Sequence, residues 1–300
     1  MRPKVEGLHH ITVICGEPDV NADFYIDVLG LRLVKKTVNH DAPELYHLFY
    51  GDRKGSVGSS ITFFPLMADN SGEPGTGQVT ELGLRIPPNS LQYWKDRLYQ
   101  KDVPYEVENL RGMETVILQD PDGLGLRLIP EKNDRFEAWE ESDVPEDHQI
   151  MGMKQVKIEA SQYDLSRQLI ELMGLENTEE NFFEADDGSG VQLIDSNRRG
   201  KMGRGSVHHI AFSLSDDEMQ EAWREELDSF GLRPSQIIER KYFKSIYFRE
   251  PSDVLFEFAT SGPGYTADED VEELGEKLVL PEKLEGRREE IEKDLPEFRR

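Results

Sequence analysis

The sequence predicts an α+β protein built from four βαβββ modules that pair with one another. One pattern, a strand followed by an amphipathic helix and several short strands, recurs four times along the 300 residues. A helix that precedes a group of short strands in every unit is typical of α+β architecture. The units share no fixed consensus, which argues against a solenoid.

The first module extends from Leu8 to about Leu66. After its opening strand, the pattern over 19–29 predicts a helix, which Gly30 should end at the C-cap position. Three further strand patterns follow, at 32–37, 46–50 and 60–64. The stretch 70–77, rich in Gly, Pro and Ser, predicts a linker to the next module.

The other three modules repeat this order of elements. Their opening strands are predicted at 79–86, 153–158 and 207–212. Their helices are predicted at 91–101, 165–173 and 216–230. We therefore expect an N-terminal domain of two modules, a linker, a C-terminal domain of two modules and a charged, helical tail. These parts are predicted at 1–130, 131–149, 150–262 and 263–300.

The composition narrows the class of protein. The chain has 60 acidic and 35 basic residues, a formal net charge of −25, so nucleic acids and anionic membranes are not expected partners. It shows neither a long apolar run nor a signal-peptide pattern, which predicts a cytoplasmic protein. A single cysteine, Cys15, excludes an internal disulfide and a thiolate zinc site. The sequence is compatible with adaptation of the acidic surface to a salt-rich host, and also with assembly into a homo-oligomer.

Four of the seven histidines occur as two pairs in matching settings. His9 and His10 open the first module, and His208 and His209 open the fourth. A strand projects alternate residues to one side, so each pair should place one imidazole on the concave face of its sheet. That alternation puts Thr12 on the same face as His10 and aims the other histidine of each pair away.

A glutamate completes a possible metal-binding set. When the module ends are aligned on their turn residues, Glu257 falls opposite Arg127. Glu257 lies between two phenylalanines in a strand, where a carboxylate is costly unless a cation compensates its charge. Two imidazoles and one carboxylate with open positions are typical of non-haem iron sites. We therefore predict that His10, His209 and Glu257 converge, which requires the first module to pair with the fourth.

The inner modules do not repeat this set. At the position of His10 and His209 they have Glu81 and Gln155, and Arg127 would repel a cation. The inner site is therefore predicted to be vestigial.

Each histidine also has a purely structural interpretation. A lone strand histidine is more often a hydrogen-bonded polar residue than a ligand. Two histidines in equivalent positions, together with Glu257, favour the metal interpretation. His47 is predicted to be hydrogen-bonded packing near the site, and His40 to be solvated.

The repeated modules resemble the vicinal oxygen chelate superfamily, which includes glyoxalase I, bleomycin-resistance proteins and extradiol dioxygenases. The similarity is greatest to the hydroquinone ring-cleaving dioxygenases and covers nearly the whole chain. The segments that show it are Gly7-Leu8-His9-His10-Ile11-Thr12, Thr37-Val38-Asn39, Tyr46-His47-Leu48-Phe49-Tyr50-Gly51-Asp52 and the tail from Leu274-Gly275 to Leu295-Pro296.

This resemblance implies two open, curved β-sheets and an extradiol-type dioxygenase that opens hydroquinone or a related dihydroxyaromatic with dioxygen. It implies Fe(II) as the cofactor, with Mn(II) as the alternative, bound by His10, His209 and Glu257. It also implies catalytic roles for a surrounding group of residues, namely His9, Thr12, His208, Arg240 and Tyr247. Arg240 has a second interpretation, a surface ion pair with one of the many glutamates.

Two other functions stay open. A glyoxalase-type isomerase or lyase would use zinc or nickel and a second glutamate in the site, but the matching segment 61–64 has no carboxylate. A metal-free resistance protein would bind an aromatic ligand without reaction, and the metal triad weighs against it.

Overall fold

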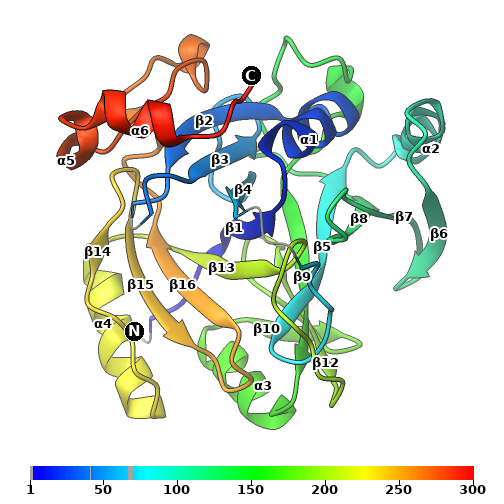
Figure 1. Ribbon diagram of the computed structural model, residues 1–300. Coiled ribbons are helices and arrows are strands. Elements are labelled where there is room, and N and C mark those ends of the chain that lie inside the picture. Colours follow the sequence, from blue (N-terminus) through cyan, green and yellow to red (C-terminus); the bar gives the residue numbers. More distant parts are fainter. Residues whose placement is uncertain (1–2, 41, 67–69) are drawn as a thin grey trace.

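The computed structural model describes residues 3–40, 42–66 and 70–300. Its strands form two eight-stranded sheets (Figure 1). The first and fourth modules make one sheet, called the outer sheet here, with strands β1 (Gly7–Cys15), β2 (Arg32–Val38), β3 (Tyr46–Gly51), β4 (Ser60–Pro65), β13 (Val207–Leu214), β14 (Ile238–Glu239), β15 (Lys244–Arg249) and β16 (Leu255–Thr260). Their order across the sheet is β14-β15-β16-β13-β1-β4-β3-β2.

The second and third modules make the other sheet, called the inner sheet. Its strands are β5 (Gln78–Ile86), β6 (Tyr105–Leu110), β7 (Met113–Gln119), β8 (Gly125–Pro130), β9 (Met153–Ala160), β10 (Glu176–Glu179), β11 (Phe182–Glu184) and β12 (Gly190–Asp195). Their order is β10-β11-β12-β9-β5-β8-β7-β6, the same plan as the outer sheet. The predicted α+β fold of four modules in two sheets is confirmed, and so is the pairing of the first module with the fourth. The division into domains at 131–149 stays a prediction, since each sheet takes one module from each half of the chain.

The four predicted helices are present. They are α1 (Pro18–Ala22), which continues into the π-helical turn η1 (Asp23–Val28), α2 (Leu91–Gln100), α3 (Tyr163–Leu172) and α4 (Asp217–Phe230). Gly30 follows η1 with φ +72°, a left-handed conformation that glycine adopts without strain. The side chain of Asp216 accepts a hydrogen bond from the backbone N–H of Met219 and caps α4.

Helix α4 covers the face of the outer sheet that is opposite the predicted site. Trp223 of α4 is fully buried, and its ring lies 4.9 Å from the ring of Phe258 on β16. Because successive residues of a strand point to opposite faces, this contact directs Glu257 to the other face of the sheet. Burial of the aromatic residues under α4 thus fixes the orientation of the carboxylate.

The tail packs against the first module. It contains the short helices η3 (Tyr265–Ala267), η4 (Val271–Glu273), α5 (Glu282–Glu285) and α6 (Arg288–Asp294), of which α5 and α6 lie near β2 in Figure 1. The ammonium group of Lys35 on β2 is fully buried and forms ion pairs with Asp268 and Glu269. The carboxylate of Asp268 also accepts a hydrogen bond from the hydroxyl of Tyr242 at 3.1 Å.

No helix among the described residues is long and apolar enough to cross a membrane.

A buried ion pair replaces the metal triad in the inner sheet. Nε and Nη2 of Arg127 donate hydrogen bonds to the two carboxylate oxygens of Glu81 at 2.7 and 2.9 Å. Nη1 donates to Oγ1 of Thr115 at 2.8 Å. A guanidinium at this position neutralises Glu81, as the sequence analysis expects of a site that does not bind a cation.

We expect Arg127→Met to lower the free energy of unfolding by about 3–5 kcal/mol, because it leaves the Glu81 carboxylate buried without its partner. The double variant Glu81→Leu/Arg127→Met removes both charges and should recover most of that loss. Urea unfolding of the two variants and the parent protein measures this difference. A double variant that is no more stable than Arg127→Met would contradict the explanation.

Candidate metal centre

The structure brings His10, His209 and Glu257 together, although the two histidines are 199 residues apart in sequence. Strands β1 and β13 pair antiparallel, and β16 runs parallel beside β13. Oε2 of Glu257 lies 3.0 Å from Nε2 of His209 and 3.4 Å from Nε2 of His10. The two Nε2 atoms are 3.4 Å apart, and all three side chains are buried.

The carboxylate of Glu257 is held at one oxygen and lacks a hydrogen-bond donor at the other. Oε1 accepts a hydrogen bond from the hydroxyl of Ser245 on β15. Oε2 is buried, and no described residue donates a well-directed hydrogen bond to it. Burial alone would raise the pKa of Glu257, but the adjacent imidazoles of His10 and His209 outweigh it and hold the pKa well below its usual range. The carboxylate is therefore ionised.

Two β-bulges bring the neighbouring histidines to the ligands. In the pairing of β1 with β13, His9 is an extra residue between the pairs Leu8–Phe212 and His10–Ala211, and His208 is an extra residue on the opposite strand. A bulge re-aims side chains that strict alternation would send to the other face. The alternation predicted for His9 and His208 is therefore wrong, and both rings lie beside the ligand histidines.

The contacts of His9 define the tautomer of His10. Nε2 of His9 lies 3.2 Å from the carbonyl oxygen of Thr260 and must donate to it, since a carbonyl only accepts. Burial lowers the pKa of His9 to about 3, so the ring is neutral and its Nδ1 is an acceptor. Nδ1 of His10, at 2.9 Å, donates to it. Once His10 is neutral, as metal binding requires, the lone pair on its Nε2 is directed to the cluster.

His208 has the same relation to His209. The two Nδ1 atoms are 2.8 Å apart, and burial lowers the pKa of His208 to about 4. A neutral His208 can accept the Nδ1 hydrogen of His209 and leave Nε2 of His209 as a lone-pair donor. Unlike His9, His208 has an exposed edge and lines a cavity.

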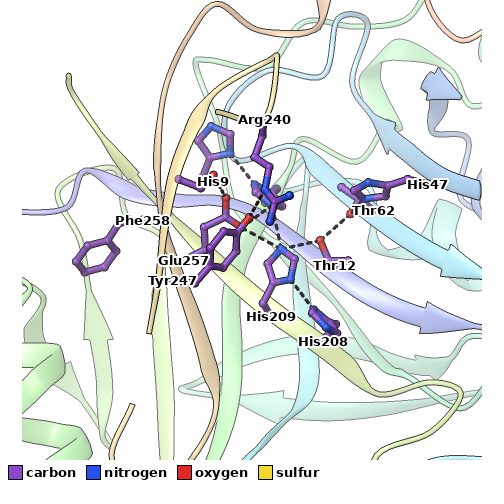
Figure 2. A network of polar contacts seen from close by, with 12 residues as sticks. His9, Thr12, His47, Thr62, His208, His209, Arg240, Tyr247, Glu257 and Phe258 are labelled. Atoms are coloured by element: carbon purple, nitrogen blue, oxygen red, sulfur yellow. Dashed lines mark hydrogen bonds and ion pairs between the residues drawn. The ribbon is translucent and has the colours of Figure 1, made fainter. Parts of the chain in front are cut away.

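A chain of hydroxyl groups reaches the site from the side of the first module. Nε2 of His47 lies 2.8 Å from Oγ1 of Thr62, which lies 2.8 Å from Oγ1 of Thr12. Oγ1 of Thr12 is 2.9 Å from Nε2 of His209. Figure 2 shows this row of side chains beside the histidine pair. His47 is therefore hydrogen-bonded near the site, as the sequence predicts.

Arg240 and Tyr247 lie on the side of the fourth module. Nε of Arg240 donates a hydrogen bond to the hydroxyl of Tyr247 at 3.2 Å, and the guanidinium lies 5.2 Å from the centre of the tyrosine ring. Burial, and then the charge of Glu257, raise the pKa of Tyr247, so its hydroxyl keeps its proton. Both residues line a cavity, as a role in the site requires.

This cavity has a volume of about 450 Å³ and reaches His10 and His209. Aromatic side chains form much of its wall, namely Phe49, Phe64, Tyr242, Phe243 and Tyr247. Asn39 and His40, both half-buried, lie on it as well, so His40 is closer to the site than the sequence indicates. A flat aromatic molecule is the kind of ligand that such walls accommodate.

Several residues of this site were not predicted from the sequence, among them Ser245, Thr62 and Tyr242. Ser245 holds Glu257, Thr62 continues the hydroxyl chain, and Tyr242 belongs to the cavity wall. Alternation alone could have identified Ser245 and Thr62, because each lies on a strand next to a predicted site residue. Tyr242 precedes β15 in a loop, where no periodic signal exists.

The donor set fits a divalent transition metal. Two imidazole nitrogens and one carboxylate oxygen are the ligands of non-haem Fe(II) sites. A cation among them would also satisfy Oε2 of Glu257, the buried oxygen without a donor. His10, His209 and Glu257 would hold it.

The sequence also matches a known superfamily and several known proteins. The profile of the Glyoxalase/Bleomycin resistance protein/Dioxygenase superfamily matches residues 7–128 and 148–258. "Putative ring-cleaving dioxygenase MhqO" of Bacillus subtilis (strain 168) is 40% identical, over 99% of this chain and 98% of that protein. The chlorohydroquinone/hydroquinone 1,2-dioxygenase of Sphingobium indicum is 32% identical, over 96% of this chain and 95% of that protein.

Solved structures are similar over most or nearly all of the chain. A crystal structure of a Bacillus subtilis protein, 40% identical, superposes with a TM-score of 0.94 over 99% of this chain and 98% of that chain. Glyoxalase I from Zea mays, 16% identical, has a TM-score of 0.62 over 85% of this chain and 92% of that chain. At that identity the likeness concerns the fold alone.

We expect the buried His9 to make the metal-free protein sensitive to acid. Its pKa is about 3 in the folded chain, whereas an exposed imidazole of the unfolded chain has a pKa of 6.5, so only the unfolded chain takes up this proton as the pH falls below 6.5. The folded state then loses about 1.4 kcal/mol per pH unit for this group. The variant His9→Gln keeps a donor for the Thr260 carbonyl but does not titrate, so its slope should be smaller. Urea unfolding of both metal-free proteins at several pH values from about 6.5 to 4.5 measures the slopes, and equal slopes would contradict the assignment.

Proposed function

Because the chain belongs to the Glyoxalase/Bleomycin resistance protein/Dioxygenase superfamily, we propose that it is a ring-cleaving dioxygenase acting on hydroquinone or a related dihydroxyaromatic. The observation that supports this best is the convergence of His10, His209 and Glu257 at an aromatic-walled cavity. The proposed cofactor is Fe(II), with Mn(II) as the alternative. When bound, the metal would hold the substrate oxygen and dioxygen on one ion and allow electrons to pass between them.

The residues around the ligands keep the site ready to bind the metal. His9 accepts the Nδ1 hydrogen of His10, and His208 is placed to accept that of His209, which would orient both imidazoles and increase their basicity. Ser245 donates to Glu257 and fixes the carboxylate. These contacts are formed without the metal, so little reorganisation should accompany its binding.

Tyr247 and Arg240 are proposed to act on the substrate. The hydroxyl of Tyr247 accepts from Arg240, so its own proton is available to a substrate oxygen in the cavity. The guanidinium of Arg240 would stabilise negative charge that develops on the substrate. The aromatic walls, such as Phe243 and Phe49, would hold the ring flat and exclude water.

Anaerobic loading of the metal-free protein with Fe(II), followed by oxygen uptake with hydroquinone, tests the proposal. We expect one dioxygen consumed for each ring opened, with loss of the aromatic absorbance. Mn(II) and Zn(II) loading are the comparisons. If hydroquinone binds tightly but no oxygen is taken up with Fe(II), with Mn(II) or with Zn(II), the result favours a ligand-binding protein and overturns the proposal.

We expect Glu257→Gln to lose Fe(II), because an amide lacks the negative charge that attracts a divalent ion. Changes to residues behind metal ligands weaken binding by about 10–100-fold, so loss of a ligand should exceed about 100-fold. Iron content and oxygen uptake should fall together while the circular dichroism spectrum is kept. Glu239→Gln makes the same substitution at an exposed position on β14, away from the three proposed ligands, and is the control. If Glu257→Gln keeps its iron and the parent rate, another carboxylate completes the site.

We expect Tyr247→Phe to lower kcat by about 10²-fold or more if its proton is transferred in the reaction. Iron content should stay at the parent level, since the hydroxyl contacts Arg240 and is not one of the three ligands. Steady-state oxygen uptake and iron analysis measure the two quantities. An unchanged kcat with a raised KM would instead assign Tyr247 to substrate binding.

A further inference from the structure

Thr62 stands at the place in the first module that Glu257 has in the fourth. On β4, Thr62 pairs with Thr12, which lies two residues after His10. On β16, Glu257 pairs with Ala211, which lies two residues after His209. The two halves of the outer sheet thus present one carboxylate and one hydroxyl at equivalent positions beside the ligand histidines.

The residues that orient these two side chains are equivalent as well. Across the sheet, Thr62 pairs with Phe49 and Glu257 pairs with Tyr247. His47 lies two residues before Phe49 and contacts Thr62 through Nε2. In the same way, a residue two positions before Tyr247 contacts Glu257, namely Ser245.

The inner sheet repeats the arrangement. Arg127 pairs with Ile117 across the sheet, and Thr115, two residues before Ile117, accepts a hydrogen bond from Arg127. In each of these three modules, therefore, one side chain (Thr62, Glu257 or Arg127) is held by a residue on the neighbouring strand (His47, Ser245 or Thr115). The residue types at this pair of positions differ from module to module, while the backbone register is the same.

The hydroxyl of Thr62 is fully engaged and uncharged. It lies between Nε2 of His47 and Oγ1 of Thr12, and both threonines are completely buried. The ring of His47 is itself held between those of Phe49 and Phe64, at centroid distances of 4.0 and 4.3 Å. A neutral hydroxyl in such a chain is a weak ligand for a divalent cation compared with a carboxylate.

We propose that Thr62, positioned by His47, limits the site to three protein ligands and thereby determines which molecules can bind the metal. With a single carboxylate, a divalent ion in the site keeps a net charge of +1, which favours an anionic phenolate ligand. A second carboxylate at position 62 would cancel that charge and compete for the coordination position. The inference rests on the proposed function in taking this anionic ligand to be the dihydroxyaromatic substrate.

The variant His47→Ser/Thr62→Glu tests it by copying the pair of the fourth module, with serine replacing the bulky imidazole. Metal-free protein is loaded with Co(II), and its affinity is measured by competition with a chelator. We expect the double variant to bind Co(II) at least about tenfold more tightly than His47→Ser/Thr62→Gln, which has the same size and no charge. We also expect Thr62→Val to keep the parent affinity.

The visible absorption of bound Co(II) gives the second readout. Hydroquinone, added without oxygen, should shift the spectrum of the parent protein but not that of His47→Ser/Thr62→Glu. Equal Co(II) affinity of the Glu and Gln double variants, or a large loss of Co(II) from Thr62→Val, would overturn the role of Thr62. If the affinity increases as expected but hydroquinone leaves the parent spectrum unchanged, the role of Thr62 holds and the proposed substrate is wrong. Should the double variants fail to fold, Thr62→Asp is compared with Thr62→Asn, a pair close to threonine in size, and equal Co(II) affinity of these two variants would overturn the role.

Discussion

Strands β1 and β13 run antiparallel along the middle of the outer sheet, and the position of every proposed ligand depends on that pair. It places His10 beside His209, and the strands that flank it add Glu257 on one side and Thr62 on the other. Its two bulges bring a second histidine to each ligand histidine. A one-residue shift of register between the two strands would separate the ligand nitrogens and turn side chains of the shifted strand to the opposite face.

The two sheets neutralise a buried carboxylate in different ways on one scaffold. In the inner sheet, the guanidinium of Arg127 binds both oxygens of Glu81, so this carboxylate has its partner within the chain. In the outer sheet, Glu257 keeps one oxygen without a donor among the described residues. Burying such a charge is costly unless a cation compensates it. The metal-free protein is therefore less stable because of this carboxylate, which in turn makes the site able to bind a cation.

Repetition made much of this fold and its three proposed metal ligands predictable. Four modules, their helices and the pairing of the first with the fourth follow from hydrophobic patterns and from histidines in matching positions. His9 and His208 could not be placed in this way, because a bulge depends on the register of a partner strand about 200 residues away, which local alternation does not describe. Arg240 had two interpretations, and only the fold could place it beside Tyr247. The loop residue Tyr242 has no periodic pattern to reveal it.

The pairing of modules also has a consequence for synthesis on the ribosome. The inner modules are neighbours in the chain and pair through β5 and β9, whereas the outer modules enclose them and pair across β1 and β13. The inner sheet can therefore form on a nascent chain while β1, already paired with β4, still lacks β13 on its other side, since contacts distant in sequence form late. His10 is made about 250 residues before Glu257. A chain that stalls between residues 209 and 257 has both histidines but lacks the carboxylate, so the proposed site is complete only after Glu257 has been made.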